Sequence, residues 1–227
     1  MDYSFLQCGE GALTVHLGDG IDPAINRRVT ALQGAIGSAG LRGITDLIPA
    51  YADLTVCYDC TVISAKALQR QLRRLLDSLS VAGQDRRRVF QLPVCYGGDY
   101  GPDLDFVCHH SGLSAQEVIE LHSAPDYLIY MLGFLPGFAY LGGLDPRLHT
   151  PRLDSPRTCI PAGSVGIGGA QTGVYPLASP GGWQLLGRTP VSVFDRQRQE
   201  PILYRAGDLV HFVPISPAEY EKIARAV

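Results

Sequence analysis

The sequence predicts an α+β protein in which a small α/β sandwich precedes a β-barrel. Three observations lead to this fold class. Strand and helix signals alternate in the first part of the chain, residues 133–190 hold too much glycine and proline for long helices, and short apolar runs separated by turns follow. With 227 residues, the chain is long enough for two domains that each bury a core.

Local signals define the opening elements. Two strand patterns, at 4–7 and 12–17, flank a Gly9-Glu10-Gly11 turn and predict a hairpin. Asp22-Pro23 predicts the start of a helix, with aspartate as the N-cap and proline at the first helical position, and Gly40 predicts its end.

Strand patterns at 44–48 and 54–58, a helix capped by Ser64 and a strand at Val89–Tyr96 complete the first part. The resulting order ββαββαβ is typical of one sheet covered by two helices.

The second part differs in composition. Residues 1–85 contain 11 glycines and prolines, whereas residues 86–227 contain 31, which indicates a boundary near the Asp85-Arg86-Arg87-Arg88 cluster. We therefore expect domains at 1–86 and 87–227. The elements expected in the second domain are a helix capped by Ser114 and Glu117, strands at 127–132, 191–194, 202–204 and 209–213, and a final helix from Ser216.

Composition excludes several classes of function. Charged residues make up 18% of the chain and the net charge is −3, so no basic field favours nucleic acid. No Gly-Lys-Ser/Thr triplet exists, which excludes a P-loop. We see neither a signal peptide nor a membrane-spanning pattern, and we expect a cytoplasmic protein with no membrane partner and six reduced cysteines.

Four motif-like runs are better explained by structure than by chemistry. Cys57-Tyr58-Asp59-Cys60 lies in a strand pattern, not at the helix N-terminus where a redox pair belongs. Neighbouring histidines in Cys108-His109-His110 point apart on a helix, so we predict no metal site. The run 162–166 lacks the helix that a nucleophile elbow needs, and 166–171 lacks the strand-turn-helix context of a dinucleotide site.

The glycine-rich run 161–169 has two interpretations. Its glycines fit barrel turns that need a positive φ, or they leave backbone N–H groups open to an anionic ligand. Polar, aromatic and cationic residues nearby favour a ligand site to some extent. These neighbours are Ser164, Gln171, Thr172, Tyr175 and Trp183, and Arg152, Arg157 and Arg188 lie on either side of the run. His122 and His149 are the available acid–base groups, and His149 is the better placed of the two.

Six groups of residues then carry a family resemblance. They are 96–98 with 101–104, the Leu121-His122-Ser123 triplet, 132–142, 161–169, 171–176 and 179–190. Together they resemble the B subunit of bacterial ATP-dependent 5-oxoprolinase, a family that includes KipI and proteins labelled allophanate hydrolase subunit 1. Ala139 and Leu135 depart from the usual motif, which affects the expected shape of that loop.

The resemblance implies a small α/β domain followed by a cyclophilin-like β-barrel. It also implies a hydrolase subunit that acts with A-type and C-type subunits, opens the small molecule 5-oxoproline to glutamate and is inactive alone. ATP with Mg²⁺ would be a substrate of the complex, and no tightly bound cofactor is implied. The alternative is a KipI-like inhibitor that binds a sensor histidine kinase; prolyl isomerisation and urea- or allophanate-linked chemistry are weaker options.

Motif position and side-chain chemistry give the expected site. His149 and Arg188 are the expected catalytic residues, and no metal ligand is expected. The residues expected to bind substrate or ATP are Arg157, Pro161, Gly163, Ser164, Val165, Gly166, Gln171, Tyr175, Gly182 and Trp183.

Overall fold

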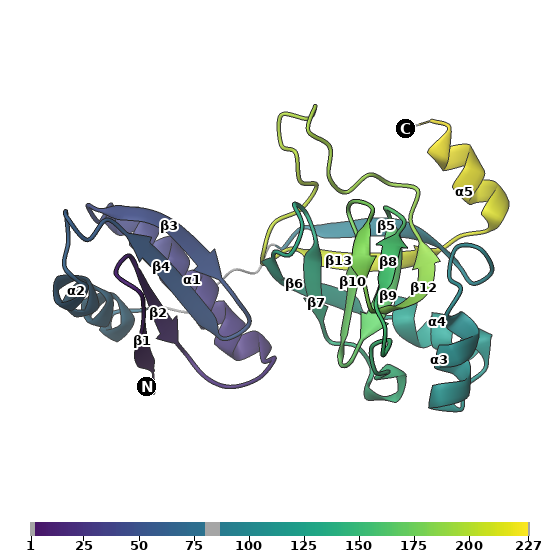
Figure 1. Cartoon of the computed structure of the whole chain (residues 1–227), viewed down its shortest axis with the longest axis horizontal. Coiled ribbons are helices and arrows are strands. Elements are labelled where there is room, and N and C mark those ends of the chain that lie inside the picture. Colours follow the sequence, from purple (N-terminus) through teal and green to yellow (C-terminus); the bar gives the residue numbers. More distant parts are fainter. Residues whose placement is uncertain (1–2, 80–86, 227) are drawn as a thin grey trace. The chain divides into compact units, whose positions relative to one another are not determined.

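The computed structural model describes residues 3–79 and 87–226 and divides the chain into two compact units, 1–86 and 87–227 (Figure 1). Each unit has its own cluster of buried apolar side chains. The expected boundary falls next to residues 80–86, which lie outside the described residues.

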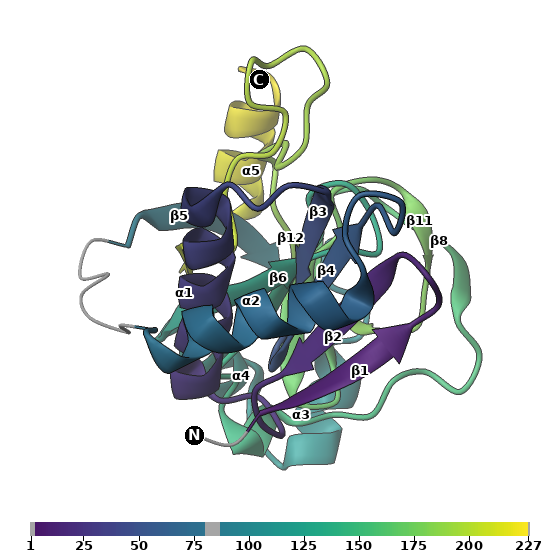
Figure 2. The ribbon, with the colours of Figure 1, turned by 90° about the vertical axis from the view of Figure 1, so that its left-hand side faces the viewer.

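The first unit is a four-stranded antiparallel sheet covered by two helices. Its elements are β1 (Ser4–Cys8), β2 (Ala12–His16), α1 (Pro23–Ala39), β3 (Ile44–Pro49), β4 (Asp53–Tyr58) and α2 (Ala65–Asp77). The strands lie in the order β1-β2-β4-β3, and Figure 2 shows both helices on the same face of this sheet.

The helix ends of this unit follow the sequence signals. The Asp22 side chain accepts a hydrogen bond from Ala24 N, and Gly40 ends α1 with a φ of 56°. The Ser64 side chain accepts from Ala67 N at the start of α2. Leu68 and Leu72 are fully buried against the sheet, as their spacing predicts.

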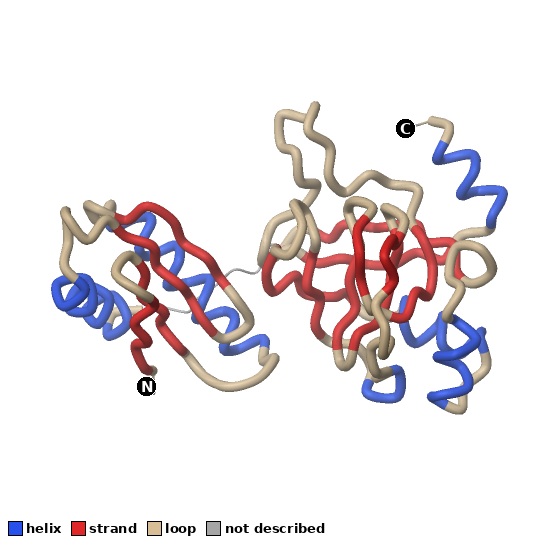
Figure 3. The backbone as a smooth tube through the Cα atoms, viewed as in Figure 1, coloured by secondary structure: helices blue, strands red, loops and turns tan. Residues whose placement is uncertain are grey.

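The second unit is built on a closed barrel, whose strands are drawn in red in Figure 3. The strand order is β10-β7-β6-β13-β5-β12-β9. Its strands are β5 (Val89–Tyr96), β6 (Asp126–Leu132), β7 (Ala139–Gly142), β9 (Ser164–Gly168), β10 (Gln171–Val174), β12 (Gln184–Arg188) and β13 (Leu209–Pro214). A separate two-stranded ribbon pairs β8 (Arg157–Ile160) with β11 (Ser179–Gly181). The predicted α+β class with a β-barrel is confirmed.

Short helices complete the second unit. They are α3 (Leu104–Ser111), α4 (Ala115–Ser123), the 3₁₀ turn η1 (Pro146–Leu148) and α5 (Pro217–Ala224). Capping boxes at Ser114 and Ser216 start α4 and α5. Among the described residues, no helix is both long and apolar enough to cross a bilayer.

Two strand assignments need correction. β5, which the sequence pattern groups with the first unit, pairs with β12 and in parallel with β13, so it is a barrel strand. The predicted strands at 191–194 and 202–204 form a single bridge, Phe194 to Ile202, within a long loop. They pair with each other only there, and neither belongs to the barrel ladder. Sequence patterns indicate strand propensity but not the pairing partner.

The barrel interior contains a chain of hydrogen bonds centred on His122. Thr172 Oγ1 donates to the Gly166 carbonyl (3.0 Å), so it must accept from His122 Nε2 (2.8 Å). His122 Nδ1 then accepts from Tyr96 Oη (2.8 Å). Burial lowers the pKa of His122 to about 3, so the imidazole is neutral in the folded protein.

This buried histidine predicts acid sensitivity. Between about pH 6.5 and pH 3, the unfolded chain binds a proton at His122 that the folded chain does not bind. The free energy of unfolding therefore falls as the pH falls, by about 2 kcal/mol from pH 7 to pH 5. Urea unfolding of the His122→Asn variant at the two pH values should show a smaller drop than wild type.

The exposed His109 provides the matched control. A His109→Asn variant should retain the full wild-type drop in unfolding free energy. An equal pH dependence in wild type and His122→Asn would contradict the assignment of a neutral buried imidazole.

Candidate functional site

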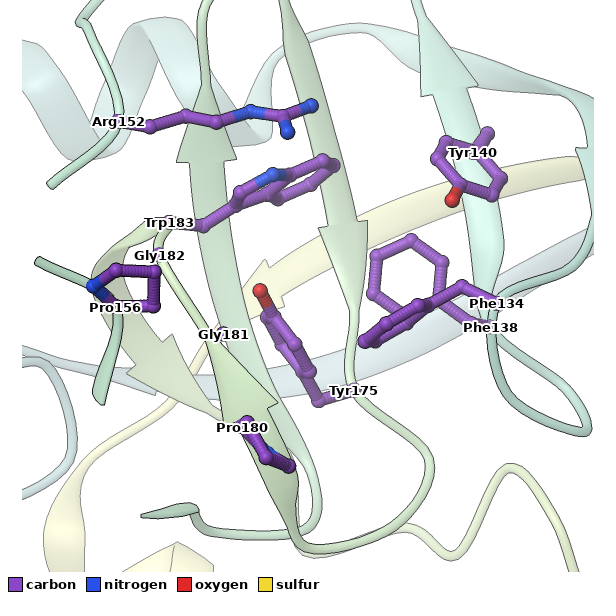
Figure 4. A pocket seen from close by; sticks show the side chains of 10 residues that line it. All are labelled: Phe134, Phe138, Tyr140, Arg152, Pro156, Tyr175, Pro180, Gly181, Gly182 and Trp183. Atoms are coloured by element: carbon purple, nitrogen blue, oxygen red, sulfur yellow. The ribbon is translucent and has the colours of Figure 1, made fainter. Parts of the chain in front are cut away.

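A pocket of about 290 Å³ lies against the wall of the barrel, beside the β8–β11 ribbon. Figure 4 shows aromatic side chains converging on it from the ends of several strands. Its lining residues are Phe134, Phe138, Tyr140, Arg152, Pro156, Tyr175, Pro180, Gly181, Gly182 and Trp183. The volume is near the lower end of the range for small-molecule sites, about 300 Å³.

Glycines on β9 and β10 leave space for these rings to pack against the outer surface of the barrel. Along β9, Val165 and Ile167 enter the barrel core, so Gly166 and Gly168 face the other side. A Cβ on Gly168 would lie 2.6 Å from indole atoms of Trp183. On β10, a Cβ on Gly173 would lie 3.0 Å from the same indole. Only glycine permits the approach at Gly168, whereas at Gly173 a Cβ would also meet the Ala139 carbonyl at 2.8 Å.

The rings pack edge to face around Phe138. Its centroid lies 5.5 Å from that of Trp183, 5.1 Å from that of Tyr175 and 4.9 Å from that of Tyr140. Phe138, Tyr175 and Trp183 are at most 4% exposed. Such T-shaped contacts hold the walls in one arrangement, so the pocket is preformed.

Tyr175 places a buried hydroxyl group at this site. Burial raises the pKa of Tyr175 to about 12, and a backbone hydrogen bond from Trp183 acts against this rise. The hydroxyl therefore keeps its proton at neutral pH and can donate a hydrogen bond. Figure 4 shows it pointing toward Trp183 and the space between the rings.

One rim of the pocket is formed by a strained turn between β6 and β7. Leu135 N donates to the Gly133 carbonyl (2.7 Å), which closes a three-residue turn around Phe134. Phe134 has a φ of 64°, a conformation that costs energy for a residue with a side chain, and it is 62% exposed. An exposed aromatic held this way fits a role at the mouth of a binding site.

The three arginines expected beside the glycine run have different surroundings. Arg157 Nη2 forms an ion pair with Asp103 (2.6 Å), whose other oxygen accepts from Leu185 N. Arg188 packs over the Tyr100 ring and does not line the pocket. Arg152 does line it, and within residues 3–79 and 87–226 it forms no ion pair.

Three of the residues expected to bind ligand come together in the pocket, namely Tyr175, Gly182 and Trp183. The others do not line it. Gln171 is in β10, Pro161 is exposed before β9, and Gly163 occupies a turn with a φ of 81°. His149 is exposed at the end of η1, with Nε2 3.4 Å from the Leu144 carbonyl.

The expectation of an open glycine loop needs correction. Residues 164–168 are the strand β9, which pairs with β10 on one edge and with β12 on the other. These pairings occupy its backbone, and Ser164, Val165 and Gly166 are buried within the wall. The glycines therefore serve turns and ring packing, and they do not form an anion cradle.

Sequence reasoning missed several lining residues. Phe134, Phe138 and Tyr140 all lie in the family motif at 132–142, and the spacing of two between Phe138 and Tyr140 places these two rings on one side of the chain where β7 begins. Nothing in the sequence distinguished Pro156 and Pro180 from the other prolines of this region as lining residues. Within the described part of the chain, no group of three or more His, Cys, Asp or Glu side chains could hold a metal ion.

Comparison with known proteins defines the class first. Residues 3–204 match the family model described as carboxyltransferase domain, subdomain C and D. The chain is 42% identical over 228 residues to the 5-oxoprolinase B subunit of Bacillus subtilis (strain 168), covering 96% of this chain and 95% of that protein. It is 46% identical over 207 residues to the 5-oxoprolinase B subunit of Escherichia coli O157:H7, covering 91% and 93%. The chain therefore belongs to the family of 5-oxoprolinase B subunits.

Solved structures agree with this fold. TTHA0988 matches with a TM-score of 0.80 and 40% identity over 90% of this chain and 40% of that chain. The conserved protein PH0987 from Pyrococcus horikoshii matches with a TM-score of 0.59 and 43% identity, over 96% of this chain and all of that one. The Kluyveromyces lactis urea carboxylase shares the fold, with a TM-score of 0.82 at 23% identity over 98% of this chain and 22% of that one.

The contact between Gly168 and the indole generates a prediction. Gly168→Ala should displace Trp183 and reduce the free energy of unfolding of the second unit by about 1–3 kcal/mol, because the new methyl group overlaps the ring. Since Trp183 is the single tryptophan of the chain, its fluorescence emission should also shift to longer wavelength as water reaches the indole.

Gly34→Ala is the control, because Gly34 is exposed within α1 and a Cβ there meets nothing within 4 Å. It should stabilise its helix by about 0.5–1 kcal/mol and leave the emission unchanged. Unchanged stability and emission in Gly168→Ala would show that the indole does not rest on β9.

Proposed function

We propose that this chain is the B subunit of an ATP-dependent 5-oxoprolinase, and that its aromatic pocket takes part in binding 5-oxoproline. The single observation that carries the proposal is a preformed aromatic pocket with one cationic lining residue, in a chain 42–46% identical to proteins named as 5-oxoprolinase B subunits. A flat five-membered lactam with one carboxylate suits those walls in size, shape and charge.

The chemistry explains why ATP is needed. A lactam resists water, and its ring closure is favourable, so opening must be coupled to phosphoryl transfer. In the proposed scheme the lactam oxygen attacks the γ-phosphorus of ATP, and the bond to ADP breaks. Water adds to the ring carbon, the C–N bond breaks as nitrogen takes a proton, and a second water releases phosphate to give glutamate.

In this scheme the pocket orients the ring and excludes water from its faces. The Tyr175 hydroxyl donates to one lone pair of the lactam oxygen and leaves the other for phosphorus. The rings of Phe138 and Trp183 meet at 77°, so one of them supports a face of the lactam while the other closes its edge.

ATP with Mg²⁺ is the proposed co-substrate, and we place its site on a partner protein of the complex. Phosphoryl transfer needs several cations around the triphosphate, whereas a single arginine lines this pocket among the described residues. We therefore propose that the chain acts with A-type and C-type subunits and is inactive alone.

ADP release with 5-oxoproline tests the proposal. The mixture of this chain with A-type and C-type subunits from the same source should release ADP in a 5-oxoproline-dependent way, and omission of any one of the three proteins should abolish that release. If the three proteins form a stable complex that shows no substrate-dependent release, the proposed function is wrong.

The role of Tyr175 gives a sharper prediction. Tyr175→Phe keeps the ring and removes the donor, so 5-oxoproline-dependent ADP release by the complex should fall about tenfold, the worth of one hydrogen bond. Tyr100→Phe is the control, because the Tyr100 hydroxyl bonds Glu221 and does not line the pocket. Equal rates for the two variants would remove Tyr175 from the reaction.

A further inference from the structure

The described residues that line the pocket carry a single positive charge. Of the ten described residues that line it, only Arg152 is charged, and no lining residue is acidic. A guanidinium with no carboxylate beside it creates a local preference for an anion. The charge of the lining therefore selects among the ligands that the aromatic walls would otherwise accept.

Two other arginines close to Arg152 in the sequence already have partners. Arg157 is held by the buried Asp103, and Arg147 by Asp145, with Nη2 to Oδ2 at 2.7 Å. Binding a ligand carboxylate with either of them would first require breaking an existing ion pair. Arg152 meets no such competition among the described residues.

The backbone on both sides of Arg152 is tied to the residues that flank Trp183. Gln184 Nε2 donates to the Pro151 carbonyl (3.0 Å), and Leu153 N donates to the Gly182 carbonyl (2.7 Å). Arg152 and Trp183 thus lie opposite each other, between two hydrogen bonds. This fixes where the arginine side chain begins, although that side chain is exposed.

The guanidinium lies over the indole. Its Cζ lies 5.9 Å from the ring centroid of Trp183, and Figure 4 shows the side chain extended above that ring. A guanidinium that lies over a ring keeps N–H donors at its edge, and that edge matches a carboxylate in a two-point contact.

We infer that Arg152 is the specificity-determining residue of the pocket and binds the carboxylate of a compact ring ligand whose ring lies among Phe138, Tyr175 and Trp183. The identity of the ring as a lactam rests on the proposed function. The requirement for a carboxylate rests on the charge and geometry of the lining residues.

Trp183 provides a direct readout, because it is the single tryptophan of the chain and lies in the pocket. The full chain is titrated with 5-oxoproline and with 2-pyrrolidinone, which has the same lactam ring without the carboxylate. The wild type should bind 5-oxoproline at least about tenfold more tightly. Arg152→Gln should weaken 5-oxoproline binding at least about tenfold and change 2-pyrrolidinone binding by less than about twofold.

Two further variants complete the titration. Arg152→Lys keeps the charge but loses the planar fork, so it should recover only part of the affinity. Arg147→Gln removes an arginine that is paired outside the pocket and should match wild type. Equal weakening of both ligands in Arg152→Gln, or no binding of 5-oxoproline by the wild-type chain, overturns the inference.

ADP release by the assembled complex separates the two hypotheses. Carboxylate-dependent binding that requires Arg152, without substrate-dependent ADP release, overturns the proposed function and leaves the inference standing. Substrate-dependent release that is unchanged in Arg152→Gln overturns the inference and leaves the proposed function standing.

Discussion

The indole of Trp183 lies against the backbone of β9, at a distance that only glycine permits at Gly168, and it also approaches Gly173 on β10. The aromatic rings of the pocket are arranged around this contact. It sets the height of the ring above the wall, and thereby the positions of Phe138 and Tyr175 that pack against its edge. A side chain at Gly168 would displace the indole, and one at Gly173 would meet the Ala139 carbonyl at 2.8 Å. The shape of the pocket therefore depends on the glycines of the barrel wall.

The same two strands carry the interior polar chain. On β10, Thr172 faces inward and bonds His122, while the next residue, Gly173, faces outward under the indole. On β9, the Gly166 carbonyl accepts from Thr172. Each hydrogen bond in this chain has a defined donor, so the neutral imidazole links α4 to β10 and, through Thr172, to β9. The interior hydrogen bonds and the outer surface that carries the rings therefore share the same two strands.

Local signals in the sequence were sufficient for helix ends and for fold class, and insufficient for pairing and for the site. Caps at Ser64 and Ser114 act within one turn of the chain, so the sequence reveals them. The partner of β5 is β13, more than a hundred residues away, and no local pattern encodes it. Likewise Arg152 and Arg157 look alike in sequence. They differ because Asp103, distant in the chain, neutralises only Arg157.

The long loop at 189–208 acquires a structural role from this arrangement, although it adds no strand to the barrel. Tyr204, which is 1% exposed, donates to the Gly137 carbonyl (2.9 Å), and Phe194 closes over the position where a Cβ on Gly137 would stand. Gly137 ends the turn that holds Phe134 at a positive φ. Strain in a turn persists only where surrounding contacts fix it. The loop supplies those contacts, so it supports the rim of the pocket from outside the barrel.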